Sequence, residues 1–167
     1  MVPLRIAVLT VSDTRTEETD ESGRILVERA RRAGHEVVEK AIVTDEQAAI
    51  EARLRAWIDS PDVDVVIATG GTGITGRDVT PEAFEAVYEK SIPGFGELFR
   101  WISFQKIATS TIQSRATAGV AKGTYLFALP GSKGAVKDAW DEILVLQLDS
   151  RTKPCNFAEL LPRLTER

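Results

Sequence analysis

Short, nearly continuous apolar runs alternate along the chain with longer stretches in which apolar residues recur every three or four positions. Runs of the first kind are typical of strands buried on both faces of a sheet, and the second spacing is typical of amphipathic helices. Such runs predict strands at residues 4–11, 64–69 and 124–129, and residues 36–43 (EVVEKAIV) are predicted to form a second strand. Helices are then expected in the intervals between these strands.

The first two intervals contain helix signals at both ends. Ser22 is predicted to be an N-cap and Gly34 a C-terminal stop. The apolar stripe of this helix is formed by Ile25, Leu26, Ala30 and Ala33. Residues 44–47 (TDEQ) have the spacing of a capping box, and Ser60-Pro61 ends the second helix. Its predicted buried face is formed by Ile50, Leu54, Trp57 and Ile58.

A third helix signal follows the strand at residues 64–69. Thr80 is predicted to be its N-cap, with Pro81 in the first helical position, and the helix is expected to run to about Lys90. Residues 91–96 (SIPGFG) are expected to form a loop that leads into the apolar segment 97–104 (ELFRWISF).

The last third of the chain contains two further helical patterns. Residues 109–120, rich in Ala, Ser and Thr, are expected to form a short helix. A long amphipathic helix is predicted after residues 130–132, with a buried face formed by Val136, Trp140, Ile143, Leu144 and Leu148. Residues 151–167 are expected to form an irregular tail.

Strands that alternate with helices favour right-handed βαβ units and a mostly parallel sheet. We therefore predict the α/β fold class, as a three-layer α/β/α arrangement with helices on both faces of the sheet. Neither an internal repeat nor a linker divides the chain. Residues 1–167 are predicted to form one domain, in which the irregular tail occupies about residues 150–167.

With 167 residues, of which 43% are hydrophobic and 28% charged, the chain has the composition of one globular domain. Its net charge of −4 gives no general attraction for nucleic acid. A single cysteine, Cys155, excludes an internal disulfide, and no apolar run has the length of a membrane span. Residues 1–10 lack the features of a signal peptide, so a cytoplasmic protein without membrane contact is expected.

In a parallel sheet, the loops that leave the carboxyl ends of the strands lie along one edge, where ligands of open α/β sheets bind. Four such loops are predicted here: Ser12-Asp13, Thr44-Asp45, residues 69–78 and residues 130–132. They supply glycine backbone, hydroxyl groups and three aspartates to one edge. The only histidine, His35, begins a strand and is therefore expected at the opposite edge, which argues against a Ser-His-Asp hydrolase.

The loop after the third predicted strand has the sequence ATGGTGITGRDVTP at residues 68–81. Gly71, Gly73 and Gly76 match the dinucleotide fingerprint, but the helix begins too late and no strand with an acidic ribose ligand follows. The Walker A phosphate-loop pattern is absent. A plain turn needs only one or two glycines. An anion-binding nest of backbone N–H groups is therefore favoured, next to the helix N-terminus near Pro81.

Three carboxylates, Asp13, Asp45 and Asp78, are predicted to lie beside this loop. Asp45 and Asp78 also suit a purely structural role near helix N-termini. Carboxylates next to phosphates repel unless a cation lies between them, which favours Mg²⁺. One His and one Cys disfavour zinc. Arg77 and Lys133 are the local cations suited to phosphate oxygens, unless they are solvated surface residues.

Four segments of the sequence resemble the MoaB/Mog family of molybdenum cofactor biosynthesis proteins. They are residues 4–23 (LRIAVLTVSDTRTEETDESG), 69–83 (TGGTGITGRDVTPEA), 128–144 (ALPGSKGAVKDAWDEIL) and 151–157 (RTKPCNF), the last being similar to the MoaB type in particular. The resemblance implies a molybdopterin-binding fold and, in active members, molybdopterin adenylyltransferase activity. Such an enzyme combines molybdopterin with Mg-ATP to give adenylyl-molybdopterin and pyrophosphate.

The resemblance also implies roles for individual residues. Asp45 and Asp78 correspond to the two essential acids of the family and are the expected catalytic and Mg²⁺-binding residues. The expected substrate-binding residues are Ser12, Asp13, Thr69, Gly70, Gly71, Thr72, Gly73, Arg77, Thr80, Pro130, Gly131 and Ser132. Some MoaB-type proteins have a degraded Arg-Asp-x-Thr element and lack the activity, whereas residues 77–80 keep it intact. Lys133 departs from the family pattern, because many relatives have proline at this position.

An active adenylyltransferase is therefore the favoured function, and a non-catalytic molybdopterin-binding or assembly protein is the alternative. An NAD-linked oxidoreductase is a third hypothesis. The expected partners are molybdopterin, ATP, the downstream metal-insertion protein and further copies of the chain. The resemblance implies a trimer or a hexamer, and the MoaB-like tail favours the hexamer. Residues 97–104 and the tail around Phe157 are candidate subunit contacts.

Overall fold

Six strands form a single sheet in the computed structural model, which describes all residues from Met1 to Arg167. The strands are β1 (Arg5–Val11), β2 (Glu36–Val43), β3 (Val65–Thr69), β4 (Lys90–Ser91), β5 (Thr117–Ala121) and β6 (Thr124–Leu129). Their spatial order is β2-β1-β3-β6-β5-β4. The first four strands of this order are parallel, and β5 and β4 continue the sheet antiparallel. The prediction of a mostly parallel sheet is thus confirmed.

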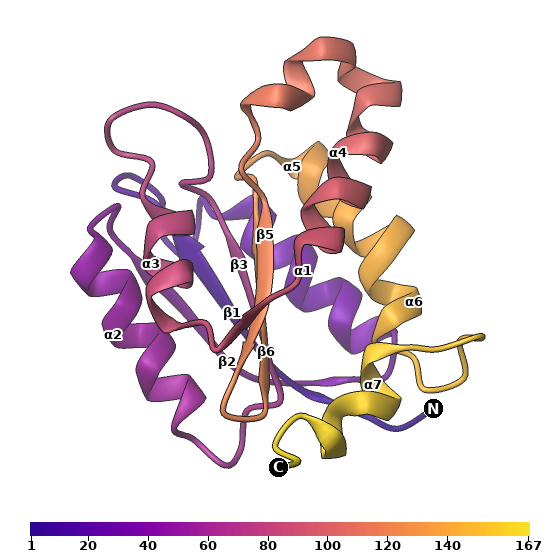
Figure 1. The fold of residues 1–167 in the computed structure, drawn as a ribbon. Helices are drawn as coiled ribbons and strands as arrows, with labels where there is room; N and C mark the ends of the chain where they lie inside the picture. The colour runs from indigo at the N-terminus through magenta and orange to yellow at the C-terminus, as the bar shows by residue number, and fades with distance from the viewer.

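Helices cover both faces of this sheet (Figure 1). One face is covered by α2 (Gln47–Ile58) and α3 (Thr80–Val87), and the other by α1 (Glu21–Arg32), α4 (Pro93–Ile107) and α5 (Lys133–Ala139). The chain continues from α5 through a π turn, Trp140–Leu144, and ends with α6 (Val145–Gln147), α7 (Phe157–Leu160) and a 3-10 turn, Leu161–Arg163. The predicted three-layer arrangement is confirmed. No helix combines the length and the apolar character that crossing a membrane requires.

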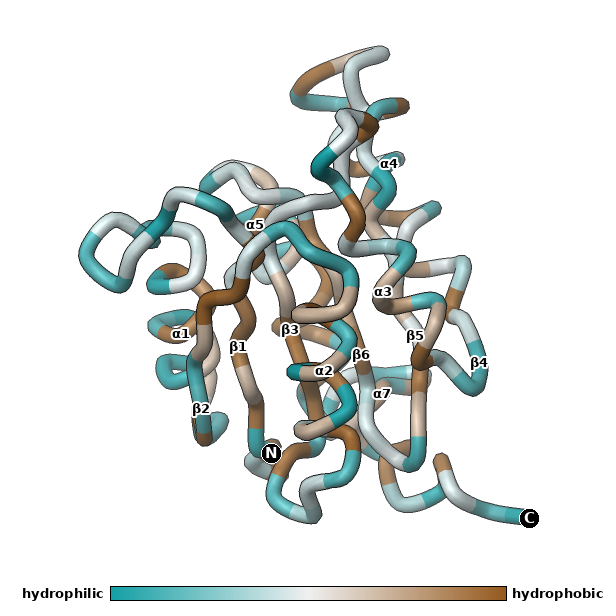
Figure 2. The backbone as a smooth tube through the Cα atoms, turned by 90° about the vertical axis from the view of Figure 1, so that its left-hand side faces the viewer, coloured by the Kyte–Doolittle hydropathy of each residue, from teal (hydrophilic) through white to brown (hydrophobic).

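Successive side chains of β1 lie on opposite faces of the sheet. Ile6 and Val8 belong to the hydrophobic cluster beneath α1 and α5. Ala7, Leu9 and Val11 belong to the cluster beneath α2 and α3. This burial on both sides explains why the strand is a nearly continuous apolar run in the sequence. Figure 2 shows the hydrophobic colour along the strands in the middle of the sheet.

The four parallel strands end level with one another. Thr10 of β1 pairs with Ile42 of β2 and with Thr69 of β3, and Thr69 pairs with Leu129 of β6. The loops after these strands therefore emerge side by side, at the upper edge of the sheet in Figure 1. His35 lies at the opposite edge, as expected, where its Nδ1 accepts a hydrogen bond from the backbone N–H that precedes β1.

Three predicted helix caps are wrong. Asp20, not Ser22, is the N-cap of α1, since its carboxylate accepts a hydrogen bond from the backbone N–H of Gly23. The capping box at residues 44–47 does not form, because α2 begins at Gln47 without a side-chain cap. Thr80 is the first residue of α3, and its hydroxyl donates to a carbonyl of the glycine loop instead. The hydroxyls of Thr80 and Ser22 thus donate hydrogen bonds to the carbonyls of Gly70 and Gly131, which lie outside their own helices.

Three further predictions are wrong between α3 and β6. Helix α3 ends at Val87, and residues 91–96 belong partly to α4, which begins at Pro93. Residues 109–120 form a 3-10 turn, Ala108–Gln113, followed by strand β5 instead of a helix. The small residues of β5 are required by packing: a Cβ atom at Gly119 would lie 2.4 Å from the ring of Tyr88.

The last long helical stretch is confirmed, with all five predicted face residues at most 3% exposed. The tail is more ordered than predicted, because residues 157–160 form the short helix α7. The ring of Phe157 lies 4.9 Å from that of Tyr125, whose hydroxyl donates a hydrogen bond to the carbonyl of Phe157. This end of the tail therefore packs on the core of its own chain.

Candidate active site

The glycine loop turns sharply over the end of β1. Gly70 has φ +104°, and a Cβ atom at this position would lie 2.2 Å from the carbonyl oxygen of Val11. Only glycine combines this backbone conformation with so close an approach. Gly70 in turn lies against Gly131: a Cβ atom added to Gly131 would lie 3.3 Å from the Cα atom of Gly70. The predicted loops 69–78 and 130–132 therefore touch, as the sheet topology indicates.

Buried hydroxyl groups fix the shape of this loop. The hydroxyl of Thr69 donates to the carbonyl of Pro130 at 2.8 Å, and that of Thr80 donates to the carbonyl of Gly70 at 2.8 Å. Both threonines are at most 1% exposed. These two residues, expected to bind substrate, hold the backbone that surrounds the site.

The two candidate catalytic acids lie against two different glycines of the loop. Asp78 accepts hydrogen bonds from the backbone N–H and the hydroxyl of Thr75, at 2.9 and 2.6 Å. Its Oδ2 atom lies 2.7 Å from the place that a Cβ atom of Gly73 would occupy. The Oδ1 atom of Asp45 is 3.1 Å from the corresponding place at Gly71. The absence of two side chains thus lets both carboxylates approach the loop backbone.

Arg77 connects two of the strand-end loops. Its guanidinium donates to both carboxylate oxygens of Asp13 at 3.0 Å, and to Glu46 at 2.8 Å. Asp13 also accepts a hydrogen bond from the backbone N–H of Asp45. The hydrogen bonds from Arg77, and then that from the Asp45 backbone, lower the pKa of Asp13. The hydrogen bonds to Asp13, and then that to Glu46, raise the pKa of Arg77. Arg77 is paired with carboxylates in this state, and it is exposed.

Asp45 differs from Asp13 in its electrostatic environment. Burial raises the pKa of the Asp45 carboxyl most, and the charge of Asp13 raises it further. The Asp13 backbone and Arg77 lower this pKa to a smaller extent, and the charge of Asp78 makes the smallest contribution to raising it. No cationic side chain forms an ion pair with Asp45 or with Asp78. The edge of the sheet thus holds three neighbouring carboxylates, of which only Asp13 is neutralised by an arginine.

Two clefts flank the contact between Gly70 and Gly131. The α1 cleft, of about 350 Å³, is lined by Thr10, Val11, Ser12, Arg15, Asp20, Glu21, Ser22, Thr69, Gly70, Gly131, Ser132 and Lys133. The α4 cleft, of about 460 Å³, is lined by Gly71, Thr72, Gly73, Asp78, Phe99, Ser103, Ile107, Ser110, Gln113, Ser114, Pro130, Gly131, Ser132 and Ala135. Most of the predicted site residues line one of the two clefts, and Gly131 and Ser132 line both. Asp13, Asp45, Arg77 and Thr80 line neither cleft.

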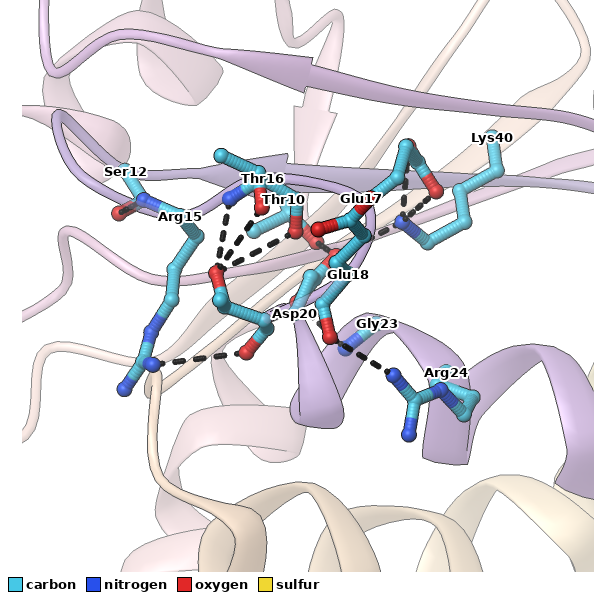
Figure 3. A network of polar contacts seen from close by, with 11 residues as sticks. Thr10, Ser12, Arg15, Thr16, Glu17, Glu18, Asp20, Gly23, Arg24 and Lys40 are labelled. Atoms are coloured by element: carbon cyan, nitrogen blue, oxygen red, sulfur yellow. Dashed lines mark hydrogen bonds and ion pairs between the residues drawn. The ribbon is translucent and has the colours of Figure 1, made fainter.

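The α1 cleft contains polar residues that the sequence analysis did not identify. Asp20 is 2% exposed and accepts hydrogen bonds from Thr10 and from Lys40, at 2.6 and 2.8 Å (Figure 3). Burial acts to raise the pKa of Asp20, but the hydrogen bonds from Lys40, Thr10 and Gly23 outweigh it and lower the pKa. Ser22 donates to the carbonyl of Gly131 at 2.8 Å. The only sequence signal was the polar stretch before the first helix, in which Asp20 and Ser22 are equally good caps.

Ser132 lines both clefts, and its neighbour Lys133 lines the α1 cleft. Ser132 is the N-cap of α5 and accepts a hydrogen bond from the backbone N–H of Ala135 at 3.2 Å. Lys133 is the first residue of α5, and its ammonium pairs with Glu21 of α1 at 3.1 Å. The lysine therefore forms an ion pair between two residues that line the α1 cleft, and the loop at residues 130–132 leads regularly into the helix.

No group of three or more His, Cys, Asp or Glu side chains is arranged to hold a metal ion by itself. Mg²⁺ differs from zinc in that it often binds through one or two carboxylates together with substrate phosphates. Asp45 and Asp78 are two carboxylates without an ion-pair partner. Two such carboxylates are the type of protein ligand that Mg²⁺ takes together with phosphates.

Comparison with known proteins identifies the class of this domain. Residues 7–150 match the family described as "Probable molybdopterin binding domain". The chain therefore belongs to the MoaB/Mog family of molybdenum cofactor biosynthesis proteins, as the four sequence segments indicate.

Within this family, the chain is similar to molybdenum cofactor biosynthesis protein B. It is 54% identical to the Escherichia coli (strain K12) protein of that name over 156 residues, which cover 93% of this chain and 92% of the relative. A crystal structure of a molybdenum cofactor biosynthesis protein B matches with a TM-score of 0.86 and 46% identity, covering 88% of this chain and 92% of the other. The tungsten cofactor synthesizing protein MoaB from Pyrococcus furiosus matches with a TM-score of 0.77 and 37% identity, covering 85% and 91%.

Proposed function

We propose that this protein is a molybdopterin adenylyltransferase, which joins molybdopterin and ATP to give adenylyl-molybdopterin and pyrophosphate. The observation that supports this proposal best is the placement of Asp45 and Asp78. Both carboxylates lie against a glycine loop at the carboxyl ends of the strands, and neither has a cationic partner. Such a pair is poorly explained as a structural feature, because like charges at one site destabilise each other.

The two clefts support a reaction between two bound substrates. They meet at Gly131 and Ser132, so that ligands in the two clefts would approach each other there. Holding two reactants in a fixed orientation supplies much of the barrier reduction in a bimolecular transfer. A protein that only binds molybdopterin requires one of these clefts.

In the proposed reaction, a terminal phosphate oxygen of molybdopterin attacks the α-phosphorus of ATP. A new P–O bond forms, the bond from the α-phosphorus to the bridging oxygen breaks, and pyrophosphate leaves with that oxygen. Phosphate is already a nucleophile, so no covalent enzyme intermediate is needed. The backbone N–H groups of the glycine loop and Ser132 bind phosphate oxygens, and the loop orients the reacting groups.

Asp45 and Asp78 are proposed to hold Mg²⁺ together with the triphosphate. Mg²⁺ bound there would supply positive charge to the phosphate oxygens. Asp78 is kept in a fixed orientation by its two hydrogen bonds from Thr75. Asp45, whose carboxyl is partly buried and has a raised pKa, gains most from a cation because its ionised form is disfavoured in the free protein.

The alternative is a non-catalytic molybdopterin-binding or assembly protein of the MoaB type. The two hypotheses differ in the need for Asp78, since binding alone requires no magnesium ligand. Asp78→Asn keeps the size of the side chain and one acceptor oxygen for Thr75. We expect this variant to fold and to bind molybdopterin but to lose about 10²-fold or more in turnover, as is usual when a key electrostatic group is removed. Unchanged turnover would refute the assigned role of Asp78.

We also propose that the chain assembles into a trimer or a hexamer. Helix α4 and the turn after it extend beyond the sheet in Figure 1, and they expose Trp101 (64%) and Ile112 (79%). Within residues 97–104, Phe99 belongs to the core of the chain, whereas Leu98, Trp101 and Phe104 are exposed. Exposed apolar side chains this dense are typical of contact surfaces. Trp101→Lys should therefore lower the mass of the particle in light scattering, and an unchanged oligomer would refute this contact.

The expected downstream partner is the metal-insertion protein that consumes adenylyl-molybdopterin. This proposal follows from the product, which has to be passed on before a metal is inserted. Pull-down of the purified metal-insertion protein by the wild-type chain, with and without the product, tests it.

A further inference from the structure

Arg115 makes an unusual set of contacts with the loop that contains Asp78. Its Nε donates to the carbonyl of Gly73 at 2.8 Å, and its Nη2 donates to the carbonyl of Asp78 at 3.0 Å. Its backbone N–H donates to the carbonyl of Thr72 at 2.9 Å. A single residue thus binds three carbonyl groups at the two ends of the loop formed by residues 73–78.

The third nitrogen atom of the guanidinium, Nη1, also has a partner. Nη1 of Arg115 forms an ion pair with Glu82 in the first turn of α3, the helix that follows the loop. The contact with Arg115 is the leading cause of the lowered pKa of Glu82. Arg115 therefore links the glycine loop, the backbone of Asp78 and α3, and the planar fork of an arginine is suited to such divergent acceptors.

The segment that contains Arg115 is itself held in place. Nη1 of Arg100, in α4, donates to the carbonyls of Ser114 and Ala116, the two neighbours of Arg115, at 3.4 and 3.0 Å. Residues 117–121 then enter the sheet as β5. The backbone on both sides of Arg115 is therefore held by Arg100, so that Arg115 can act as a rigid support for the loop.

We infer that Arg115 is a positioning residue, which keeps the carboxylate of Asp78 in place by fixing both ends of the loop 73–78. This inference deepens the proposed function and rests on it. The other side-chain restraint on the loop is the exposed Arg77, which pairs with Asp13 and Glu46. Ile74, Thr75 and Gly76 are exposed, and the side-chain contacts of Asp78 lie within the loop itself. Without Arg115, the pair formed by Thr75 and Asp78 stays intact but moves as a unit relative to the clefts.

Two variants separate this role from a simple contribution to charge or stability. Arg115→Met removes the guanidinium and keeps a long side chain. Glu82→Gln removes the ion pair but keeps an acceptor oxygen for Arg115 and leaves both carbonyl contacts in place. If Arg115 acts through the two carbonyls, the first variant is impaired and the second is close to wild type. Arg115→Lys keeps the charge without the fork, and it provides a second test if the methionine variant folds poorly.

The loop restraint is measured by hydrogen–deuterium exchange of the peptide that covers residues 70–80, in the protein without substrates. We expect faster uptake in Arg115→Met and Arg115→Lys, and unchanged uptake in Glu82→Gln. In the adenylylation assay, kcat of the arginine variants should fall by roughly 10- to 100-fold with nearly unchanged KM values, as for a displaced catalytic group.

Three results overturn the inference: unchanged exchange in both arginine variants, faster exchange with unaltered kcat, or equal damage from Glu82→Gln. If the wild-type protein makes no product, the proposed function fails, and the exchange measurement still decides whether Arg115 holds the loop.

Discussion

The contact between Gly73 and Asp78 allows the carboxylate of Asp78 to be displaced without being removed. In Gly73→Ala, the added methyl group would lie 2.7 Å from Oδ2 of Asp78, where ordinary contact begins at 3.4 Å. Gly73 has no positive φ, so the backbone accepts alanine without strain. The carboxylate must therefore move by about 0.7 Å or more, and displacements of this size cost up to about 10²-fold in catalysis.

The effect on stability should be much smaller. The two hydrogen bonds from Thr75 are exposed, and a hydrogen bond contributes about 1 kcal/mol. Replacing glycine by alanine also restricts the unfolded chain, which offsets about 0.4–1 kcal/mol of this loss. We expect the free energy of unfolding to fall by at most about 1–1.6 kcal/mol, and Tm by at most about 3–6 °C.

Gly76→Ala is the matched control, because the same substitution in the same loop meets no atom within 4 Å and no positive φ. Turnover should fall by roughly 10- to 100-fold in Gly73→Ala and stay near wild type in Gly76→Ala. Steady-state release of pyrophosphate, together with thermal unfolding of both variants, checks this. Equal turnover in the two variants would show that the placement of Asp78 does not control the reaction.

Three further substitutions test other parts of the structure. The raised pKa of Asp45 means that the native state binds its proton more tightly than the unfolded state, so stability falls as the pH rises through that pKa. Asp45→Asn should therefore raise Tm at neutral pH, and this gain should vanish in acid. The same variant should abolish turnover. Asp20→Asn weakens a buried ion pair with Lys40 and should cost about 2 kcal/mol in urea unfolding, whereas a loss below about 0.5 kcal/mol would contradict the role of this network. Tyr125→Phe leaves the carbonyl of Phe157 without its donor and should cost about 1 kcal/mol, and faster exchange confined to the tail would confirm the cause.

The central strands of the sheet were predictable because they are buried on both faces. Such strands are continuous apolar runs, and β6 has the predicted bounds, residues 124–129. The bounds of β2, residues 36–43, were also predicted, although β2 is an edge strand without a fully buried residue. Strand β5 was missed because its sequence is set by its neighbours. Gly119 leaves space for Tyr88 and Ala118 lies in the core, and neither residue type is typical of strands.

The candidate site was predictable only in part. The sheet topology brings the strand-end loops together, and the segment from Gly70 to Thr80 contains most of the candidate chemistry. Arg115 and Asp20 were not predictable, because each acts through contacts with carbonyls or cations that are distant in the sequence. The predicted caps failed for a related reason, since the hydroxyls of Ser22 and Thr80 bind backbone carbonyls across the site.

We propose that this protein transfers an adenylyl group to molybdopterin with the help of Asp78. The most direct test is incubation of the purified protein with molybdopterin, Mg²⁺ and ATP labelled at the α-phosphate. The wild-type protein should form labelled adenylyl-molybdopterin and pyrophosphate in equal amounts, and Asp78→Asn should form neither at a comparable rate while still binding molybdopterin. A wild-type protein that binds molybdopterin tightly and releases no pyrophosphate would contradict the claim and favour the non-catalytic alternative.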